Sequence, residues 1–377
     1  MSDKDWKTRP ELIREIALES GFDLVAFGPA DLGDHGDYFT HWLDAGRSGE
    51  MDYLDRNRER ILDPQKFAPG ARSTISLGFD YGGPAAGTRD GQGKVARYAV
   101  GRDYHRFLGK ATSRIRDRLE AEGMARGSMK IGTDAVPILE RALAARAGIG
   151  FLAKSAGIIN PSLGPYLLLS EVLTPQELPP DPPSVGTCGT CTACLDGCPT
   201  GAITAPHQVD ATKCLSYTTI ELRGFVPEPL RNLQGNWLFG CDVCLEVCPF
   251  SHRGRATLAD PSDRPAALRP HPVLETYDLV GVLELTEQAY DRDWVGTAMR
   301  RATRSGLRRN AATVLGNLGD DRAAPALIRA LADPDPVVRG HACWALGALD
   351  AGRKELASLY PVERDERVRA EIRAVLE

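Results

Sequence analysis

The chain has 377 residues, enough for two or three domains and a sizeable buried core. Apolar residues make up 42% of it and charged residues 26%, which is close to the globular averages and excludes a disordered or fibrous chain. The formal net charge of −5 argues against wholesale coating of nucleic acid but leaves room for a local basic patch.

The beginning of the chain carries neither an apolar run of signal-peptide length nor a twin-arginine pair, and no stretch of about 20 apolar residues follows. We therefore expect a cytoplasmic protein without a membrane span. Eight of the nine cysteines fall between Cys188 and Cys248. In a reducing compartment, clustered thiols indicate metal ligands before they indicate disulfides.

Residues 1–178 alternate between helical and strand patterns, which predicts an α/β domain. We expect helices over Glu11–Leu18, Tyr104–Leu119 and Ile138–Ala147, the last opened by Pro137, and buried strands over Leu24–Gly28, Ser73–Phe79 and Tyr166–Val172. Five prolines then crowd into residues 175–183, which no helix or central strand tolerates. We place a domain boundary there.

A periodic pattern marks residues 300–377. Leu307-Arg308, Val338-Arg339 and Val368-Arg369 recur at intervals of 31 and 30 residues. This spacing predicts an all-α tail of HEAT-like repeats, whose units bury their apolar faces by stacking on neighbours. The tail could cap the preceding domain, present a curved surface or serve packing alone. Between residues 256 and 299 we expect a proline-rich connector.

The cysteines of residues 179–255 form two runs. Cys188–Pro199 reads C-x2-C-x2-C-x3-C-P, the spacing of bacterial ferredoxins that bind [4Fe–4S] clusters. Cys241–Pro249 has the same ending but lacks one cysteine, which Cys214 can supply. The pattern predicts a ferredoxin-like domain with two [4Fe–4S] clusters.

In such domains the last cysteine of each run binds the other cluster. We expect one cluster on Cys188, Cys191, Cys194 and Cys248, and the other on Cys198, Cys214, Cys241 and Cys244. The alternative is a pair of structural zinc sites, although zinc typically uses separated C-x2–4-C pairs without the x3-C-P ending. The ninth cysteine, Cys343, is expected to be a small buried apolar residue.

Several segments together resemble one known family, the cobalamin-dependent epoxyqueuosine reductases of tRNA modification. Besides both cysteine runs, they are Met51–Asn57, Ala96–His105, Asp134–Gly148, Ile159–Gly164 and Gly235–Cys241. The resemblance implies a base-off cobalamin held between the α/β and ferredoxin-like domains. It also implies reduction of epoxyqueuosine to queuosine at the wobble position of tRNA.

Within this resemblance, Asp134 matches the family's proton donor, and a donor working near neutral pH needs its pKa raised by burial. The alternative role of Asp134 is helix capping. The residues that the resemblance implies at the corrin are Asn57, Arg97, Tyr98, Asp134, Lys154, Ser155, Ile158, Leu169, Ser216, Cys241 and Asp242. Two segments depart from the family: Phe151–Ser155 stands for Trp-x-Gly-Lys-Asn, and Leu169–Glu171 stands for Leu-Gly-Glu.

The expected macromolecular partner is the anticodon stem-loop of tRNA, bound by arginines that suit phosphate groups and splayed loop bases. The candidates are Arg223, Arg231, Arg300, Arg301, Arg304, Arg308 and Arg309. Charge runs are also found as ordinary solvated faces. We further expect an external low-potential electron donor and a monomer.

Two other functions stay open. One is a corrinoid reductase of another substrate, similar to the reductive dehalogenases. The other is a ferredoxin-like electron carrier that binds no corrin and has no use for Asp134.

Overall fold

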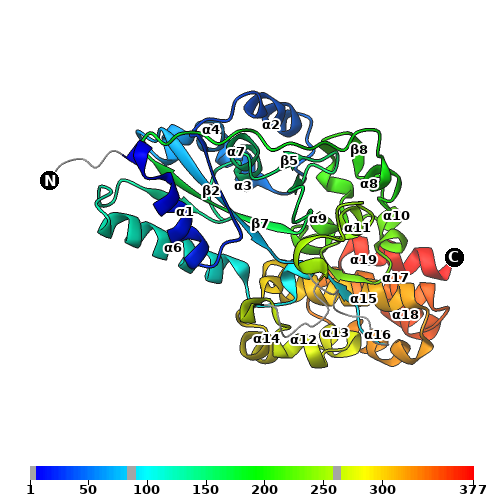
Figure 1. Cartoon of the computed structure of the whole chain (residues 1–377). Helices are drawn as coiled ribbons and strands as arrows, with labels where there is room; N and C mark the ends of the chain where they lie inside the picture. The colour runs from blue at the N-terminus through cyan, green and yellow to red at the C-terminus, as the bar shows by residue number, and fades with distance from the viewer. Residues whose placement is uncertain (1–5, 83–90, 258–264) are drawn as a thin grey trace.

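The computed structural model describes residues 6–82, 91–257 and 265–377. A four-stranded sheet forms the first part of the chain, in the order β1-β2-β7-β4 with every neighbouring pair antiparallel (Figure 1). Its strands are β1 (Leu24–Pro29), β2 (Ser73–Asp80), β4 (Lys130–Gly132) and β7 (Leu167–Thr174). The three strands expected from the sequence are confirmed, and β4 is an addition at the edge.

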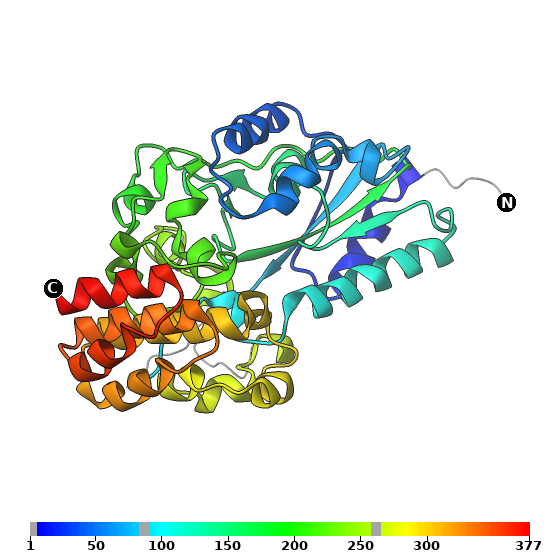
Figure 2. The ribbon, with the colours of Figure 1, turned by 180° about the vertical axis from the view of Figure 1, so that it is seen from behind.

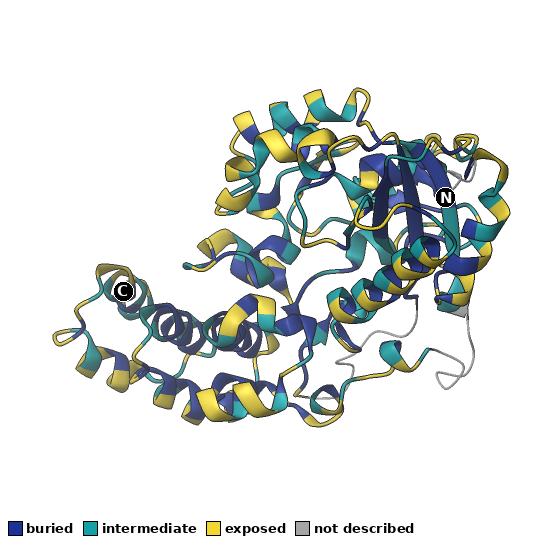
Figure 3. Cartoon of the chain, turned by 90° about the vertical axis from the view of Figure 1, so that its left-hand side faces the viewer, coloured by how far each residue is buried: buried dark blue, intermediate teal, exposed yellow. Residues whose placement is uncertain are grey.

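Helices cover both faces of this sheet, so β2 is buried along its whole length (Figure 3). Helix α7 (Glu140–Ala147) packs on one face, and α1 (Pro10–Glu19) and α6 (Tyr104–Ala121) pack on the other. Four short helices connect β1 to β2: α2 (His35–Asp44), α3 (Asp52–Arg56), α4 (Arg58–Leu62) and α5 (Pro64–Phe67).

The start of α7 differs from the sequence prediction. The helix begins at Glu140, not at Ile138, so Pro137 lies in the preceding loop. Ile138 donates its N–H to the carbonyl of Val136 in a tight turn. Its side chain is buried in a cluster with Leu143 of α7 and Leu173 of β7. Residues 133–139 are therefore a loop, which places Asp134 outside any helix cap.

The cysteine-bearing part is small and rich in loops. Its elements are α8 (Ala193–Asp196), β8 (Ile203–Ala205), β9 (Gln208–Val209), α9 (Leu215–Ile220), α10 (Glu228–Arg231), β10 (Trp237–Phe239) and α11 (Val243–Glu246). Strand β10 pairs in parallel with β3 (Lys94–Val95). The short hairpin β5 (Phe151–Leu152) and β6 (Ile158–Ile159) packs against Cys188 and Cys248. These contacts join the part to the preceding one across the boundary at residues 175–183.

The remaining chain is helical, in agreement with the expected HEAT-like tail (Figure 2). The helices are α12 (Pro272–Thr276), α13 (Leu279–Leu283), α14 (Glu287–Asp293), α15 (Thr303–Leu318), α16 (Ala324–Ala330), α17 (Pro336–Ala348), α18 (Arg353–Leu359) and α19 (Glu366–Leu376). Helices α15, α17 and α19 stack in sequence, and the repeating positions Leu307, Val338 and Val368 are fully buried. Cys343 is buried as expected. The expected connector carries α12–α14, and its Pro261 lies outside the described residues.

Three arginines expected to contact tRNA are buried in this packing, so that prediction is wrong for them. Arg309 is 1% exposed and donates to the carbonyls of Thr218, Leu222 and Gly224. Arg231 is paired with Glu371, and Arg308 with Asp333. Arg309 and Arg231 make these bonds between the cysteine-bearing part and the tail, and Arg308 makes its ion pair within the tail. A buried charge needs such partners. Among the described helices, none is both long and apolar enough to span a membrane.

Candidate active site

Asp134 lies in the loop between β4 and α7, with its backbone in the left-handed region at φ 57°. Its Oδ2 accepts a short hydrogen bond from the hydroxyl of Tyr104 and lies 3.0 Å from Nε2 of His105. The other ring nitrogen of His105, Nδ1, lies 2.7 Å from Oδ1 of Asp103. Asp103 caps α6, and the first turn of that helix supplies Tyr104 and His105 as partners of the Asp134 carboxylate.

The charges of this cluster are mutually dependent. Burial acts to lower the pKa of His105, but its hydrogen bonds to Asp103 and Asp134 prevail and raise that pKa to about 9. Burial acts to raise the pKa of Asp134, but the hydrogen bonds from His105 and Tyr104 hold it below its usual value. The rise in the pKa of Asp134 that a corrin lying over the carboxyl could provide stays a prediction. At neutral pH the proton resides on His105.

His105 and Tyr104 were not among the residues singled out from the sequence. They belong to the segment Ala96–His105, which carried the family resemblance without a role for either side chain. The sequence did contain one signal for His105: an aspartate lies two residues before it at the start of a helix. Asp103 caps that helix and orients the imidazole ring.

The first group of thiols surrounds the loop at α8. Burial raises the pKa of Cys194, and the nearby thiolates of Cys188, Cys248 and Cys191 add to that rise. The backbone N–H of Lys154 lies 3.5 Å from Sγ of Cys188. These four thiols therefore lie within electrostatic reach of one another, although Cys248 belongs to the second run.

The second group lies beside α9 and α11. Burial, together with the nearby thiolates of Cys214 and Cys198, raises the pKa of Cys241 to about 12. Burial also raises the pKa of Cys244, with the same neighbours contributing. In the described part of the chain, no three of these side chains close on a site the size of a single metal ion. A [4Fe–4S] cluster needs its four thiolates further apart than one ion does.

Tyr98 lies between the Asp134 loop and the second group of thiols. The negative charges of Asp242, Asp134 and Cys214 all add to the effect of burial in raising its pKa. Its ring packs edge-on against Tyr104, with 5.8 Å between centroids, and it also packs against Phe239. Tyr98 is half-buried, so part of this aromatic side chain between the Asp134 loop and the thiols is exposed.

Asp242 is buried beside this surface, and its Oδ2 accepts the backbone N–H of Arg97 at 2.7 Å. Burial raises the pKa of Asp242 to about 6, in spite of Arg97. The guanidinium of Arg97 reaches Glu246 on α11. Arg97, Tyr98, Cys241 and Asp242, which were expected at one site, thus come together.

The other residues expected at the corrin are spread more widely. Asn57 separates α3 from α4, and its side chain donates to the carbonyl of Tyr53. Lys154 donates from Nζ to the carbonyls of Gly189 and Cys191, so it braces the thiol loop, and Ser155 follows it in the β5–β6 turn. Ile158 is a core residue, and Leu169 packs beside it. The Ser216 side chain hydrogen-bonds Cys214.

The remaining arginines expected to bind tRNA lie at the surface or half-buried. Arg301 pairs with Glu221, and its guanidinium lies 5.4 Å from the ring centre of Tyr53. Arg223 donates to the carbonyl of Arg301. Arg300 pairs with Asp291, and Arg304 donates to the carbonyl of Leu285.

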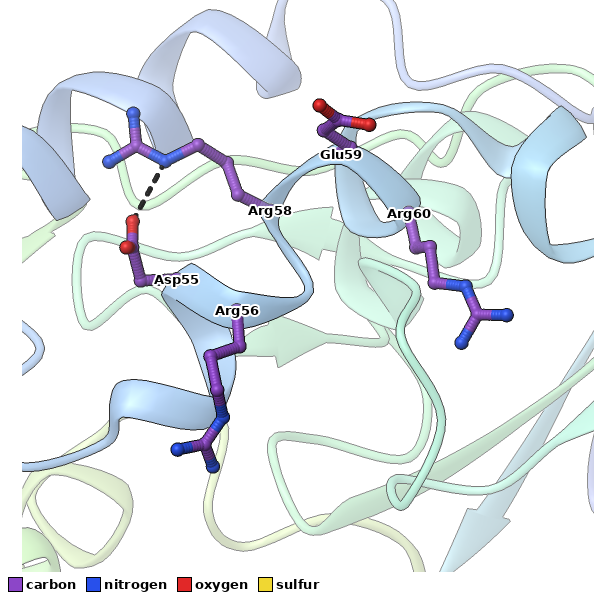
Figure 4. A pocket seen from close by; sticks show the side chains of 5 residues that line it. All are labelled: Asp55, Arg56, Arg58, Glu59 and Arg60. Carbon is purple, nitrogen blue, oxygen red and sulfur yellow. Dashed lines mark hydrogen bonds and ion pairs between the residues drawn. The ribbon is translucent and has the colours of Figure 1, made fainter.

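A hollow of about 720 Å³ opens next to this group, at α3 and α4 (Figure 4). It is lined by Asp55, Arg56, Arg58, Glu59 and Arg60. From the sequence, the arginines beside Asn57 are candidates either for the corrin site or for an ordinary solvated face.

Three family models match the chain. One described as "Epoxyqueuosine reductase QueG, DUF1730" matches residues 62–135, one described as "4Fe-4S double cluster binding domain" matches residues 187–251, and one described as "HEAT repeats" matches residues 293–377. Epoxyqueuosine reductase of Pseudomonas aeruginosa is 35% identical, over 89% of this chain and 92% of its own length. The Escherichia coli enzyme of that name is 33% identical, over 89% and 88%.

Solved structures of epoxyqueuosine reductases are similar to this chain over nearly its whole length. An epoxyqueuosine reductase crystallised with an epoxyqueuosine-modified tRNA-Tyr stem loop is similar with a TM-score of 0.86 and 29% identity, covering 98% of each chain. An epoxyqueuosine reductase from Bacillus subtilis, described with its aspartate catalytic loop swung out of the active site, has a TM-score of 0.87 and 30% identity, again covering 98% of each chain.

Proposed function

Because the chain belongs to the epoxyqueuosine reductase family, we propose that it reduces epoxyqueuosine to queuosine at the wobble position of tRNA, with Asp134 delivering a proton. The observation that carries the role of Asp134 is its hydrogen bond to His105, whose pKa is raised to about 9. A carboxylate in contact with an imidazolium can take a proton from it at neutral pH and transfer that proton to the substrate.

The proton balance fits this cluster. Reduction of an epoxide to an alkene releases the oxygen as water and consumes two electrons and two protons. One proton must reach the oxygen as its carbon–oxygen bond breaks. Asp134 is half-exposed, so it can face a substrate, while His105 and Asp103 behind it are the proton store. In this arrangement the proton comes from the imidazolium of His105 through the carboxylate of Asp134, so Asp134 does not have to be a carboxylic acid of raised pKa.

Two [4Fe–4S] clusters supply electrons one at a time. We assign Cys188, Cys191, Cys194 and Cys248 to one cluster and Cys198, Cys214, Cys241 and Cys244 to the other, because each group of thiols lies within electrostatic reach. The second group is the nearer one to Tyr98 and Asp242. An external low-potential donor would refill the clusters.

A base-off cobalamin fits the surface formed by Tyr98, Asp242 and Arg97. This surface presents a partly exposed aromatic side chain flanked by the cluster thiols on one side and Asp134 on the other. When bound there, cobalamin would supply a strongly reducing, nucleophilic cobalt for opening the epoxide. Asn57 and Ser155 are further candidates for the edge of this site, whereas Lys154 and Ser216 support the thiol loops.

The test is anaerobic reduction of epoxyqueuosine-containing tRNA by the reconstituted protein with added cobalamin, followed by nucleoside analysis. Queuosine is the expected product. Cobalamin binding without epoxide reduction would favour a corrinoid reductase of another substrate. Absence of any spectral change on adding cobalamin would favour a ferredoxin-like carrier.

A further inference from the structure

The hollow at α3 and α4 contains two arginines whose charge is not balanced nearby. Arg58 pairs with Asp44 and Asp55, and Glu59 pairs with Lys66, so the acids of the hollow are already neutralised. Within the described residues, the side chains of Arg56 and Arg60 make no hydrogen bond or ion pair. Figure 4 shows both side chains extending to the same side of the ribbon, away from Arg58 and Glu59.

This pair is continuous with the surface around the active site. Tyr53 lies one turn before Arg56 on α3 and stacks with Arg301 of the helical tail. The charge of Asp134 reaches Tyr53 and contributes to raising its pKa, after burial and Glu221. Tyr53 thus lies between Arg301 and Arg56 along this surface, and Arg60 lines the same hollow as Arg56.

We propose that Arg56 and Arg60 bind phosphodiester groups of the tRNA substrate. The planar guanidinium fork matches phosphate oxygens, and two unneutralised forks beside an exposed tyrosine suit the backbone next to a splayed loop base. The inference rests on the proposed tRNA substrate and names residues outside the arginines expected from the sequence.

The test measures binding of an unmodified anticodon stem-loop to holoenzyme carrying Arg56→Gln and Arg60→Gln. Each single variant, Arg56→Gln and Arg60→Gln, is also compared with Arg58→Gln, which removes one charge from the same hollow but from an arginine already paired. We expect the double variant to bind at least about 10-fold more weakly, with the slope of log affinity against log salt reduced by about 1–2.

Unchanged RNA affinity, or an equal loss with Arg58→Gln, would overturn the proposal. Loss of cobalamin affinity with RNA binding intact would also overturn it, and would assign the two arginines to the phosphate of the corrinoid nucleotide. The stem-loop is unmodified and no turnover is measured. The binding result therefore tests the roles of Arg56 and Arg60 even if the protein does not reduce the epoxide.

A second observation concerns how the Asp134 loop is held. Thr133 Oγ1 lies 2.7 Å from Ser170 Oγ, and both residues are buried. One residue later, the backbone N–H of Asp134 donates to Oε1 of Glu140 at 2.6 Å. Ser170 belongs to the segment Leu169–Glu171, which departs from the Leu-Gly-Glu that the family resemblance implies.

The loop needs such anchors. A left-handed backbone at a residue other than glycine costs about 1 kcal/mol or more, and it persists only when the surroundings impose it. The loop also folds back so closely that a Cβ on Gly132 would meet the Val136 side chain at 2.4 Å. We infer that Ser170 and Glu140 are positioning residues that hold Asp134 against His105.

This inference predicts that Glu140→Ala lowers kcat about 10-fold with little change in KM, and that Glu140→Gln, which keeps an accepting oxygen, restores most of it. Ser170→Gly should cost about threefold. In an Asp134→Asn background neither change should reduce turnover further, because both act through Asp134. Full additivity would overturn the inference.

A second measurement does not depend on turnover. The pKa of His105 followed by NMR in the holoenzyme with oxidised clusters should fall from about 9 toward its usual value in Glu140→Ala, as it should in Asp134→Asn. An unchanged His105 pKa in Glu140→Ala would show that Glu140 does not hold Asp134 in place. If Asp134→Asn is fully active, the proton-donor role fails, whereas the His105 titration still decides the positioning role.

Discussion

The imidazole Nε2 of His105 lies 3.0 Å from Oδ2 of Asp134, and the pair carries one positive and one negative charge at neutral pH. In the proposed proton transfer, His105 is the acid of the pair and Asp134 is the group that would face the substrate. That proposal does not need a raised pKa at Asp134.

Asp134→Asn keeps the shape of the side chain and removes its ability to transfer a proton. We expect epoxide reduction to slow by at least about 100-fold, since general acid catalysis contributes about 10²–10⁴-fold. Iron content and cobalamin affinity should stay normal. Near-normal turnover would remove Asp134 from the mechanism, and lost cobalamin binding would assign it to the cofactor site.

The pH dependence of turnover should report on His105. Its folded-state pKa of about 9 lies above the usual 6.5, so the imidazolium is present at neutral pH and is lost as pH rises through 9. We expect the chemical step, measured in single turnover, to decline above about pH 9. His105→Gln should be slow at all pH values and should lack that decline.

The same pair contributes to stability with a defined sign. Because the pKa of His105 is raised on folding, the contribution is complete below pH 6.5 and is lost between about pH 6.5 and 9. Comparing the urea midpoints of native protein and His105→Gln across this range measures it. A difference that grows with pH would contradict the assignment.

The reconstituted protein should contain about eight irons per chain. Cys248→Ala should disrupt the cluster held by Cys188, Cys191 and Cys194 and leave the other intact, as judged by spectroscopy. Cys343→Ala is the control, because that thiol is buried in the tail, and it should leave the iron content unchanged. Selective loss of the other cluster in Cys248→Ala would disprove the crossed assignment.

Charge reversal at Arg300, Arg301 and Arg304 should weaken tRNA binding and leave cobalamin affinity unchanged. These arginines are partly exposed, and phosphate contacts make binding fall steeply with salt. Filter binding at several salt concentrations measures the tRNA affinity and its dependence on salt. Unchanged affinity would identify them as an ordinary solvated face.

Arg309→Met should destabilise the fold, not the RNA complex. The substitution leaves the buried carbonyls of Thr218, Leu222 and Gly224 without this donor, at about 1–3 kcal/mol each. Urea denaturation should show a loss of about 3 kcal/mol or more. Arg322→Met is the control, since Arg322 is exposed and pairs with Asp320 only two residues away, and it should change stability by about 0.5 kcal/mol or less.

The sequence was informative where function depends on spacing along the chain. The two cysteine runs predicted the double-cluster domain, and the interval between Leu307 and Val338 predicted stacked helices. The sequence could not distinguish Arg304 from Arg309, because burial depends on which face of α15 meets the cysteine-bearing part. The partners of Asp134 were also hidden, since Tyr104 and His105 come from about 30 residues upstream and meet it only through packing of α6 against the sheet.

The parallel ladder between β3 and β10 joins Lys94–Val95 to Trp237–Phe239, roughly 140 residues later. During synthesis, β3 emerges from the ribosome long before its partner strand exists. The aromatic surface at Tyr98, directly after β3, can therefore be completed only after the first cysteine run, Cys214 and β10 have been made. We expect the cobalamin site to form late in folding, once the chain that carries most of the cluster ligands is available to hold it.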